Sequence, residues 1–165
     1  IGLQLENYME ETDDEKPHLE IILKFAKVNG ADIDAVRASP GLPTTRAWVD
    51  WLINVGEKQP WYCGIAASRV GTESQSPKLY GKVLHALREI YKFDEEDIEH
   101  FWLHSEVDVE HGERGFKALI RHCASREMQD MAIKFARESA HMRWLYFDGI
   151  YLHYEQGYDL KLPPL

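Results

Sequence analysis

The sequence has little of what disulfide-stabilised, membrane-spanning or nucleic-acid-binding proteins need. Its two cysteines, Cys63 and Cys123, cannot build a disulfide framework or a four-cysteine zinc site. No apolar run approaches the roughly 20 residues that cross a bilayer, and no signal-peptide pattern opens the chain. Lys and Arg number 19 against 28 Asp and Glu, a net charge of −9. We therefore expect a cytoplasmic protein that binds neither nucleic acid nor a membrane.

Strand-like alternation between turn dipeptides is also missing, and helical periodicity takes its place. The length of 165 residues corresponds to one domain. The pattern predicts an all-α bundle of about seven helices over residues 1–165. Because the chain starts at Ile1 within an expected helix, we expect an N-terminal helical segment to be missing. The start signals are Pro17 at a first helical position, Thr44 or Thr45 as a cap, a restart at 74–77, and Ser125 as the cap of the last long helix.

The most informative stretch is residues 101–111, where His104, Asp108 and His111 recur at i, i+4 and i+7. At about 100° per residue they share an arc of roughly 60° on one helix. Their neighbours on that arc are apolar or small, which predicts a buried face. Burying an unpaired carboxylate is costly, and a bound metal ion would remove the cost, since His and Asp are ligands for iron, manganese or zinc. A hydrogen-bonded core pair or a buried His–Asp ion pair is the ordinary alternative, and these residues alone leave the metal site and the core pair open.

Two further regions carry side chains of the same types. His18 opens a helix, and Glu11 lies seven residues earlier in an acidic cluster that would ordinarily be a solvated cap. Glu73 lies in an otherwise apolar helical stretch, where a carboxylate needs a partner unless the chain bends outward there.

These motifs together resemble one protein family. Glu11-x6-His18, Glu73 in a Glu-Ser-Gln-x-Pro setting and His104-x3-Asp108-x2-His111 look like the ligand set of haem-oxygenase-like di-metal oxidases. That group lies in the superfamily of the thiaminase-II (TenA-type) and pyrroloquinoline-quinone-synthesis (PqqC-type) proteins. The resemblance covers most of residues 5–152. If the register slips by one residue, Glu10 replaces Glu11.

The resemblance implies an all-α, haem-oxygenase-like bundle that binds two Fe ions, or Fe with Mn, through these six residues. It further implies an oxidoreductase that uses O2 as co-substrate on a small amino acid, amine or fatty-acid-like molecule. The outcomes would be N-oxygenation, desaturation or C–C cleavage, with an external electron donor where the reaction needs one. Substrate contacts are not assigned, and the candidates are Tyr62, Arg69 and Arg143.

Other interpretations predict different chemistry. A metal-independent thiaminase-II-like hydrolase needs a nucleophilic cysteine, for which Cys63 and Cys123 are the candidates. A PqqC-like oxidase would share the fold. A ferritin-like di-iron bundle uses Glu-x-x-His on two helices, which Glu138-x-x-His141 matches by letter. A helical interaction module, or a homodimer, would use exposed aromatic residues such as Trp48 and Trp51, which could equally be core residues.

Overall fold

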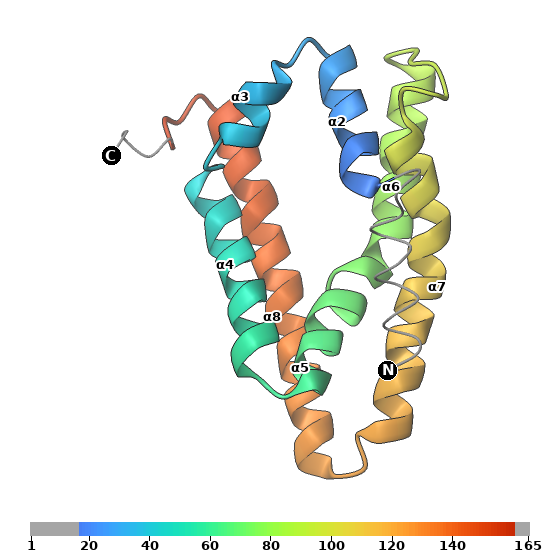
Figure 1. Ribbon diagram of the computed structural model, residues 1–165, viewed down its shortest axis with the longest axis vertical. Helices are drawn as coiled ribbons and strands as arrows, with labels where there is room; N and C mark the ends of the chain where they lie inside the picture. Colours follow the sequence, from blue (N-terminus) through green and yellow to red (C-terminus); the bar gives the residue numbers. More distant parts are fainter. Residues whose placement is uncertain (1–16, 161–165) are drawn as a thin grey trace. The chain divides into compact units, whose positions relative to one another are not determined.

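We describe residues 17–160 of a computed structural model, in which the chain is all-α (Figure 1). No strand occurs among these described residues, which confirms the predicted fold class. Short π-helical and 3-10 turns interrupt the α-helices. The elements are α2 (His18–Val28), α3 (Ile33–Ala38), α4 (Pro43–Lys58), α5 (Trp61–Ile65), η1 (Ala66–Val70), η2 (Glu73–Gln75), α6 (Ser76–Glu89), α7 (Glu99–His122), α8 (Arg126–Ile150) and η3 (Tyr151–Glu155).

Helix starts follow the predicted signals in part. The Ser125 hydroxyl accepts a hydrogen bond of 3.2 Å from the Met128 N–H, so the predicted cap of α8 is confirmed. The predicted caps Thr44 and Thr45 are wrong, because Pro43, whose φ is already helical and which has no N–H to satisfy, begins α4. Pro17 is the N-cap of α2, one position earlier than predicted, with ψ at 130°.

The chain forms two compact units. Unit 1 contains residues up to Ser39 and the range Gln75–Arg114, and unit 2 contains Pro40–Ser74 and the residues from Gly115 onward. Helix α7 contributes its first part to unit 1 and its last part to unit 2. That residues 1–165 act as a single domain stays a prediction.

The core of unit 1 joins α6 to the start of α7. Leu84 and Leu87 of α6 pack with Ile98, which is completely buried. Phe25 of α2 covers this cluster and contacts the Phe101 ring edge-on at a centroid distance of 4.9 Å. These contacts fix α2 and α6 against the α7 segment that carries His104.

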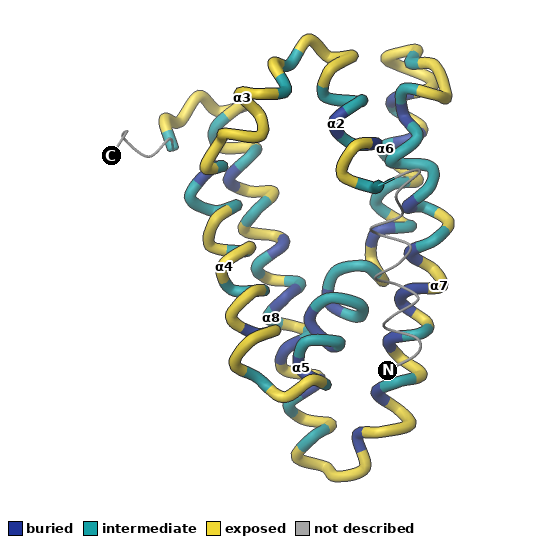
Figure 2. Tube along the Cα trace, in the orientation of Figure 1, coloured by how far each residue is buried: buried dark blue, intermediate teal, exposed yellow. Residues whose placement is uncertain are grey.

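The core of unit 2 lies between α8 and the segment from α4 to η1. Val55, Cys63, Ala67 and Phe135 form one buried cluster, and Figure 2 shows buried and exposed residues alternating along α8. The Trp51 ring stacks on the Phe135 ring at 6.2 Å. Trp48 similarly lies 5.0 Å from the ring of Tyr146. Both tryptophans are therefore half-buried against α8, as the core interpretation predicted.

Within residues 17–160, no helix is both long enough and apolar enough to cross a membrane.

The turn between η1 and η2 approaches α8 too closely for any side chain at Gly71. A Cβ there would lie 2.5 Å from the Ala136 carbonyl oxygen and 2.6 Å from the Ser139 Cβ. We therefore expect Gly71→Ala to lower the free energy of unfolding by about 1–3 kcal/mol, measured by urea denaturation. Gly81→Ala is the control, because nothing lies within 4 Å of the added Cβ inside α6. It should raise stability by about 0.5–1 kcal/mol, and equal effects of the two changes would contradict the close approach.

Candidate metal centre

The face of α7 that carries His104, Asp108 and His111 is buried, as the sequence predicted. Their exposed fractions are 8%, 3% and 1%. A helix of 24 residues supplies all three side chains, so their spacing is set by the helical repeat rather than by loop conformation. Two imidazoles and a carboxylate therefore share a part of the protein from which water is largely excluded.

His104 has a defined tautomer. Its Nδ1 lies 2.7 Å from the carbonyl oxygen of His100, one turn earlier in α7. A carbonyl oxygen can only accept, so the His104 Nδ1 carries the proton and donates it. In the neutral ring the Nε2 then keeps its lone pair. Metal-binding histidines are commonly oriented in this way, by a hydrogen bond from the other ring nitrogen.

Asp108 and His111 are neighbours that do not share a hydrogen bond. The Asp108 Oδ1 and the His111 Nδ1 are 3.6 Å apart, which is longer than hydrogen-bond distance. The two side chains therefore form no direct hydrogen bond, and their separation is that of an ion pair when the imidazole is protonated. Their polar atoms lie close enough to contact one cation.

His18 meets the same helix from α2. Its ring lies edge-on to the His104 ring, with centroids 4.6 Å apart. Since His18 is the first residue of α2, the N-cap Pro17 and the Phe25 contact of that helix position it. The structure thus brings together His18 and His104, two of the predicted ligands that lie 86 positions apart in the sequence.

Two residues beside this pair were missed by the sequence analysis. The His100 ring lies 4.2 Å from the His104 ring, and the Tyr80 ring of α6 lies 5.8 Å from His100 and 6.1 Å from His104. His100 precedes His104 by four residues, so extending the i, i+4 series backward along α7 would have found it. Tyr80 leaves no comparable signal, because only tertiary packing brings α6 to α7.

His100 is neutral at neutral pH. Burial lowers its pKa to about 4, and the nearby imidazoles of His104 and His18 lower it further, while Asp108 acts in the opposite direction. The buried Nδ1 of His100 has no hydrogen-bond partner among the described residues. The ring of His100 therefore adds an uncharged imidazole beside the start of the buried face.

Glu73 lies in η2 and belongs to unit 2. Its partner is Arg69, one turn earlier, and both side chains are less than one-fifth exposed. The sequence predicted that a carboxylate in this stretch needs a partner, and Arg69 is a partner of Glu73. Arg69, predicted as a substrate contact, is therefore engaged with Glu73. Glu11 and its alternative Glu10 lie outside the described residues.

The chain around Glu73 is fixed to α8. Arg143 is 7% exposed, and its Nη1 donates a hydrogen bond of 2.6 Å to the Thr72 carbonyl. The Thr72 and Ser139 hydroxyl oxygens lie 2.9 Å apart. Arg143, another predicted substrate contact, thus holds the backbone next to Glu73. The third, Tyr62, is half-buried in α5 between the two clusters of unit 2, and burial raises its pKa.

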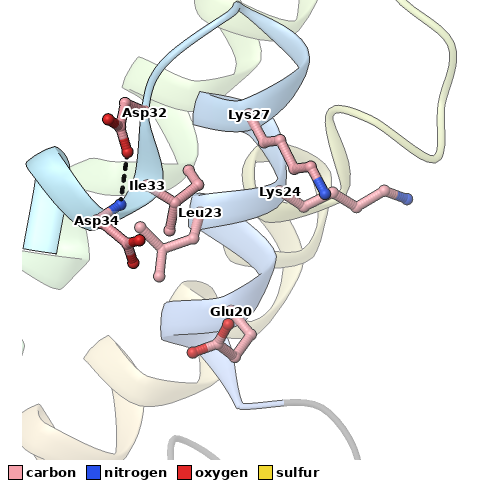
Figure 3. Close-up of a pocket in the computed structure, with 7 residues that line it drawn as sticks. All are labelled: Glu20, Leu23, Lys24, Lys27, Asp32, Ile33 and Asp34. Carbon is pink, nitrogen blue, oxygen red and sulfur yellow. Dashed lines mark hydrogen bonds between the residues drawn. The ribbon is translucent and has the colours of Figure 1, made fainter.

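A surface pocket of about 510 Å³ between α2 and α3 is separate from the buried face of α7 (Figure 3). Its charged residues serve the local structure. Asp32 caps α3 by accepting from the Asp34 N–H at 3.0 Å, Glu20 pairs with Arg37 and Lys24 pairs with Glu96. The pocket is lined by Glu20, Leu23, Lys24, Lys27, Asp32, Ile33 and Asp34. It offers no histidine and is not a candidate metal centre.

An apolar groove of about 370 Å³ lies in unit 2 between the end of α7 and the start of α8. The Gln129 side chain is the one polar group among its lining residues, and its Nε2 donates to the Cys123 carbonyl at 3.1 Å. The groove is therefore suited to an apolar chain. Its lining residues are Val70, Phe116, Leu119, Ile120, Cys123, Gln129, Ala132, Ile133 and Ala136.

The donors on α7 fit a transition-metal ion. Imidazole nitrogen and carboxylate oxygen suit iron, manganese and zinc. The His104 tautomer leaves Nε2 available, and the Asp108 carboxylate is buried on the same face of α7. Fold and site together define an all-α protein with a buried imidazole–carboxylate face of the kind that holds a metal ion.

The family comparison agrees with this class. A family model described as an iron-containing redox enzyme matches residues 4–144, and the chain therefore belongs to that haem-oxygenase-like family. The protein is accordingly an oxidoreductase, and its family is described as one of iron-containing enzymes. A search of curated proteins found no match to the chain.

The alternatives based on other residues fit the structure less well. Both thiols are buried, and burial raises the pKa of Cys63 and of Cys123. A nucleophilic cysteine needs the opposite shift. Glu138 forms an ion pair with Lys134 at 3.8 Å, and His141 is exposed, so this pair does not enter a buried ferritin-like centre.

The raised thiol pKa values predict slow alkylation. At pH 8 a thiol with a raised pKa holds less thiolate than free cysteine, and burial also blocks the reagent. Both cysteines should react with iodoacetamide at least about tenfold more slowly in the native protein than in urea, as followed by mass spectrometry. Rapid native labelling of either thiol would instead favour the hydrolase interpretation.

Proposed function

We propose that this protein is an O2-activating non-haem di-iron oxidase or oxygenase that acts on a small amino acid, amine or fatty-acid-like substrate. The observation that carries the proposal is the buried α7 face with His104, Asp108 and His111. Membership in the iron-containing redox family supports iron as the metal. The number of ions, the use of O2 and the reaction type are part of the proposal.

The proposed ligands are three histidines and three carboxylates. His104, Asp108 and His111 come from α7, and His18 from the start of α2. Glu11 and Glu73 complete the set by resemblance to the family. Two ions, Fe with Fe or Fe with Mn, would carry a positive charge that three carboxylates largely offset, and the imidazoles bind as neutral ligands.

The protein's own residues orient and shield the site. His104 presents Nε2 because its Nδ1 is bonded to the His100 carbonyl. The Tyr80 ring packs beside the His100 and His104 rings, and the Phe101 ring packs beside His100, so that these aromatic rings would shield the site from water. When bound, ferrous ions supply the electrons that O2 needs to become an oxidant.

Arg69 has a defined part in this proposal. Its guanidinium pairs with the Glu73 carboxylate. Where a metal takes over that carboxylate, Arg69 becomes available to the carboxylate of an amino-acid or fatty-acid-like substrate.

The first test is metal content. Protein loaded anaerobically with ferrous iron should hold close to two ions per chain by plasma mass spectrometry, because the six proposed ligands are enough for two sites. Circular dichroism confirms that the sample is folded. A folded protein that binds no iron would refute the proposal, and oxidase activity in such a sample would favour the PqqC-like alternative.

The second test compares two histidines of the same helix. His111→Ala should lose roughly one iron equivalent, because loss of a ligand weakens a metal site by at least about 10–100-fold. His122→Ala is the matched control, since His122 is exposed at the end of α7 and its ring contacts Trp61. It should keep the iron content of the unsubstituted protein.

The same variants separate a ligand from a core residue. Apo melting temperature is measured beside bound iron for each. If His111 were only a hydrogen-bonded core side chain, His111→Ala would cost about 1–3 kcal/mol of stability with unchanged iron, and the ligand assignment would be withdrawn.

A further inference from the structure

The apolar groove between the end of α7 and the start of α8 has a buried floor and an exposed rim. The floor contains small side chains, because Cys123 and Ala132 are both buried. The rim carries larger ones, since Phe116, Ile120 and Ile133 are exposed. All the residues that line the groove belong to unit 2. A groove with small side chains below and large ones on both sides is shaped for a slender occupant.

An occupant of this groove meets almost no polar group. The Gln129 amide already donates its hydrogen bond to the Cys123 carbonyl. An extended peptide would place its N–H and C=O groups against apolar side chains, which costs free energy. An α-helix is about 10 Å across, so a groove of about 370 Å³ admits less than one turn of it. An alkyl chain is both slender and free of polar groups, and it suits this shape and this lining.

The two ends of the groove differ in charge. At one end, α7 turns back into α8 (Figure 1). Towards the other end, Arg137 follows Ile133 by four residues, so the two side chains lie on the same side of α8. Arg137 is exposed and forms no ion pair among the described residues, whereas the neighbouring Glu138 is paired with Lys134. A guanidinium without a carboxylate partner therefore lies at the rim of the groove.

We propose that this groove binds a fatty-acid-like molecule, with the alkyl chain along the groove and the carboxylate at the Arg137 guanidinium. The apolar lining accounts for the chain. The guanidinium accounts for the single negative charge, which it can bind through two parallel N–H···O bonds. The end of the alkyl chain then points towards the turn between α7 and α8. Binding at this site depends on neither the metal nor the proposed reaction.

Calorimetric titration of the full chain with dodecanoate is the direct test. It is carried out without O2, with and without ferrous iron, at concentrations below micelle formation. The dissociation constant should be on the order of 10–100 µM and equal in both samples. Each CH2 group added between octanoate and dodecanoate should tighten binding about twofold to fourfold, because it buries further apolar surface. Dodecyltrimethylammonium carries the same chain with a positive charge and should bind at least about tenfold more weakly.

A pair of isoleucine variants tests the contact with the alkyl chain. Ile120→Glu places a charge on the rim at a residue that is 81% exposed, so the fold should tolerate it while dodecanoate binding weakens at least about tenfold. Ile53→Glu is the matched control, because Ile53 is 53% exposed on α4 and does not line the groove. This variant should bind dodecanoate as the unsubstituted chain does. Circular dichroism establishes folding of each variant.

A pair of arginine variants tests the contact with the carboxylate. Arg137→Glu should weaken dodecanoate binding at least about tenfold and tighten the binding of dodecyltrimethylammonium, because the charge at the rim changes sign. Arg121→Glu is the matched control, since Arg121 is exposed next to the turn between α7 and α8, at the opposite end of the groove. It should change either affinity by no more than about twofold at physiological salt.

Three results would overturn the assignment. The first is a folded chain that binds no dodecanoate. The second is equal loss of binding in Ile120→Glu and Ile53→Glu, or equal affinity for the two amphiphiles, either of which would mean non-specific adsorption. The third is a dimeric chain that Ile120→Glu converts to a monomer in sedimentation equilibrium, which would mean that a second copy covers the groove. Iron content is measured separately and tests the proposed function alone.

Discussion

The cost of burying charge is the constraint on which the candidate centre depends. Asp108 lies on a face of α7 where it is 3% exposed, between histidines that are themselves buried. A carboxylate in such surroundings must be neutralised, hydrogen-bonded or paired with a cation. The Asp108 Oδ1 lies 3.6 Å from the His111 Nδ1, and a cation bound by both groups is the arrangement that we propose. Imidazole and carboxylate donors suit iron, manganese and zinc alike, and the family description favours iron among them.

The second constraint is the path of the chain before Glu73. A π-helical turn, closed by the Gly71 N–H to the Ala66 carbonyl at 2.8 Å, carries Arg69 onto Glu73. Arg143 and Ser139 of α8 then hold Thr72. π-turns inside helices are often found at functional sites. Here the π-helical turn η1 brings Arg69 and Glu73 together just after α5.

Unit 1 holds two pairs of proposed ligands, Asp108 with His111 and His18 with His104, and different interactions bring the members of each pair together. His111 and Asp108 are neighbours through the helical repeat of α7 alone. His18 reaches His104 only because Phe25 of the same helix packs on Phe101, which lies one turn before His104. Loss of the aromatic contact would therefore affect the second pair and leave the first in place.

The sequence alone determined the helical class, the cap at Ser125 and the buried face of α7, because each follows from local propensity or from a helical period within one segment. His100 lay within reach of the same reasoning. The contact of His18 with His104, the place of Tyr80, and the use of Arg69 and Arg143 within the protein were decided only by tertiary structure. Each joins segments far apart in the chain or depends on a π-turn, and side-chain packing between helices leaves no periodic signal in either segment. Helix α4 begins at Pro43 rather than after Thr44 or Thr45, because the fixed φ and missing N–H of proline favour the first helical position.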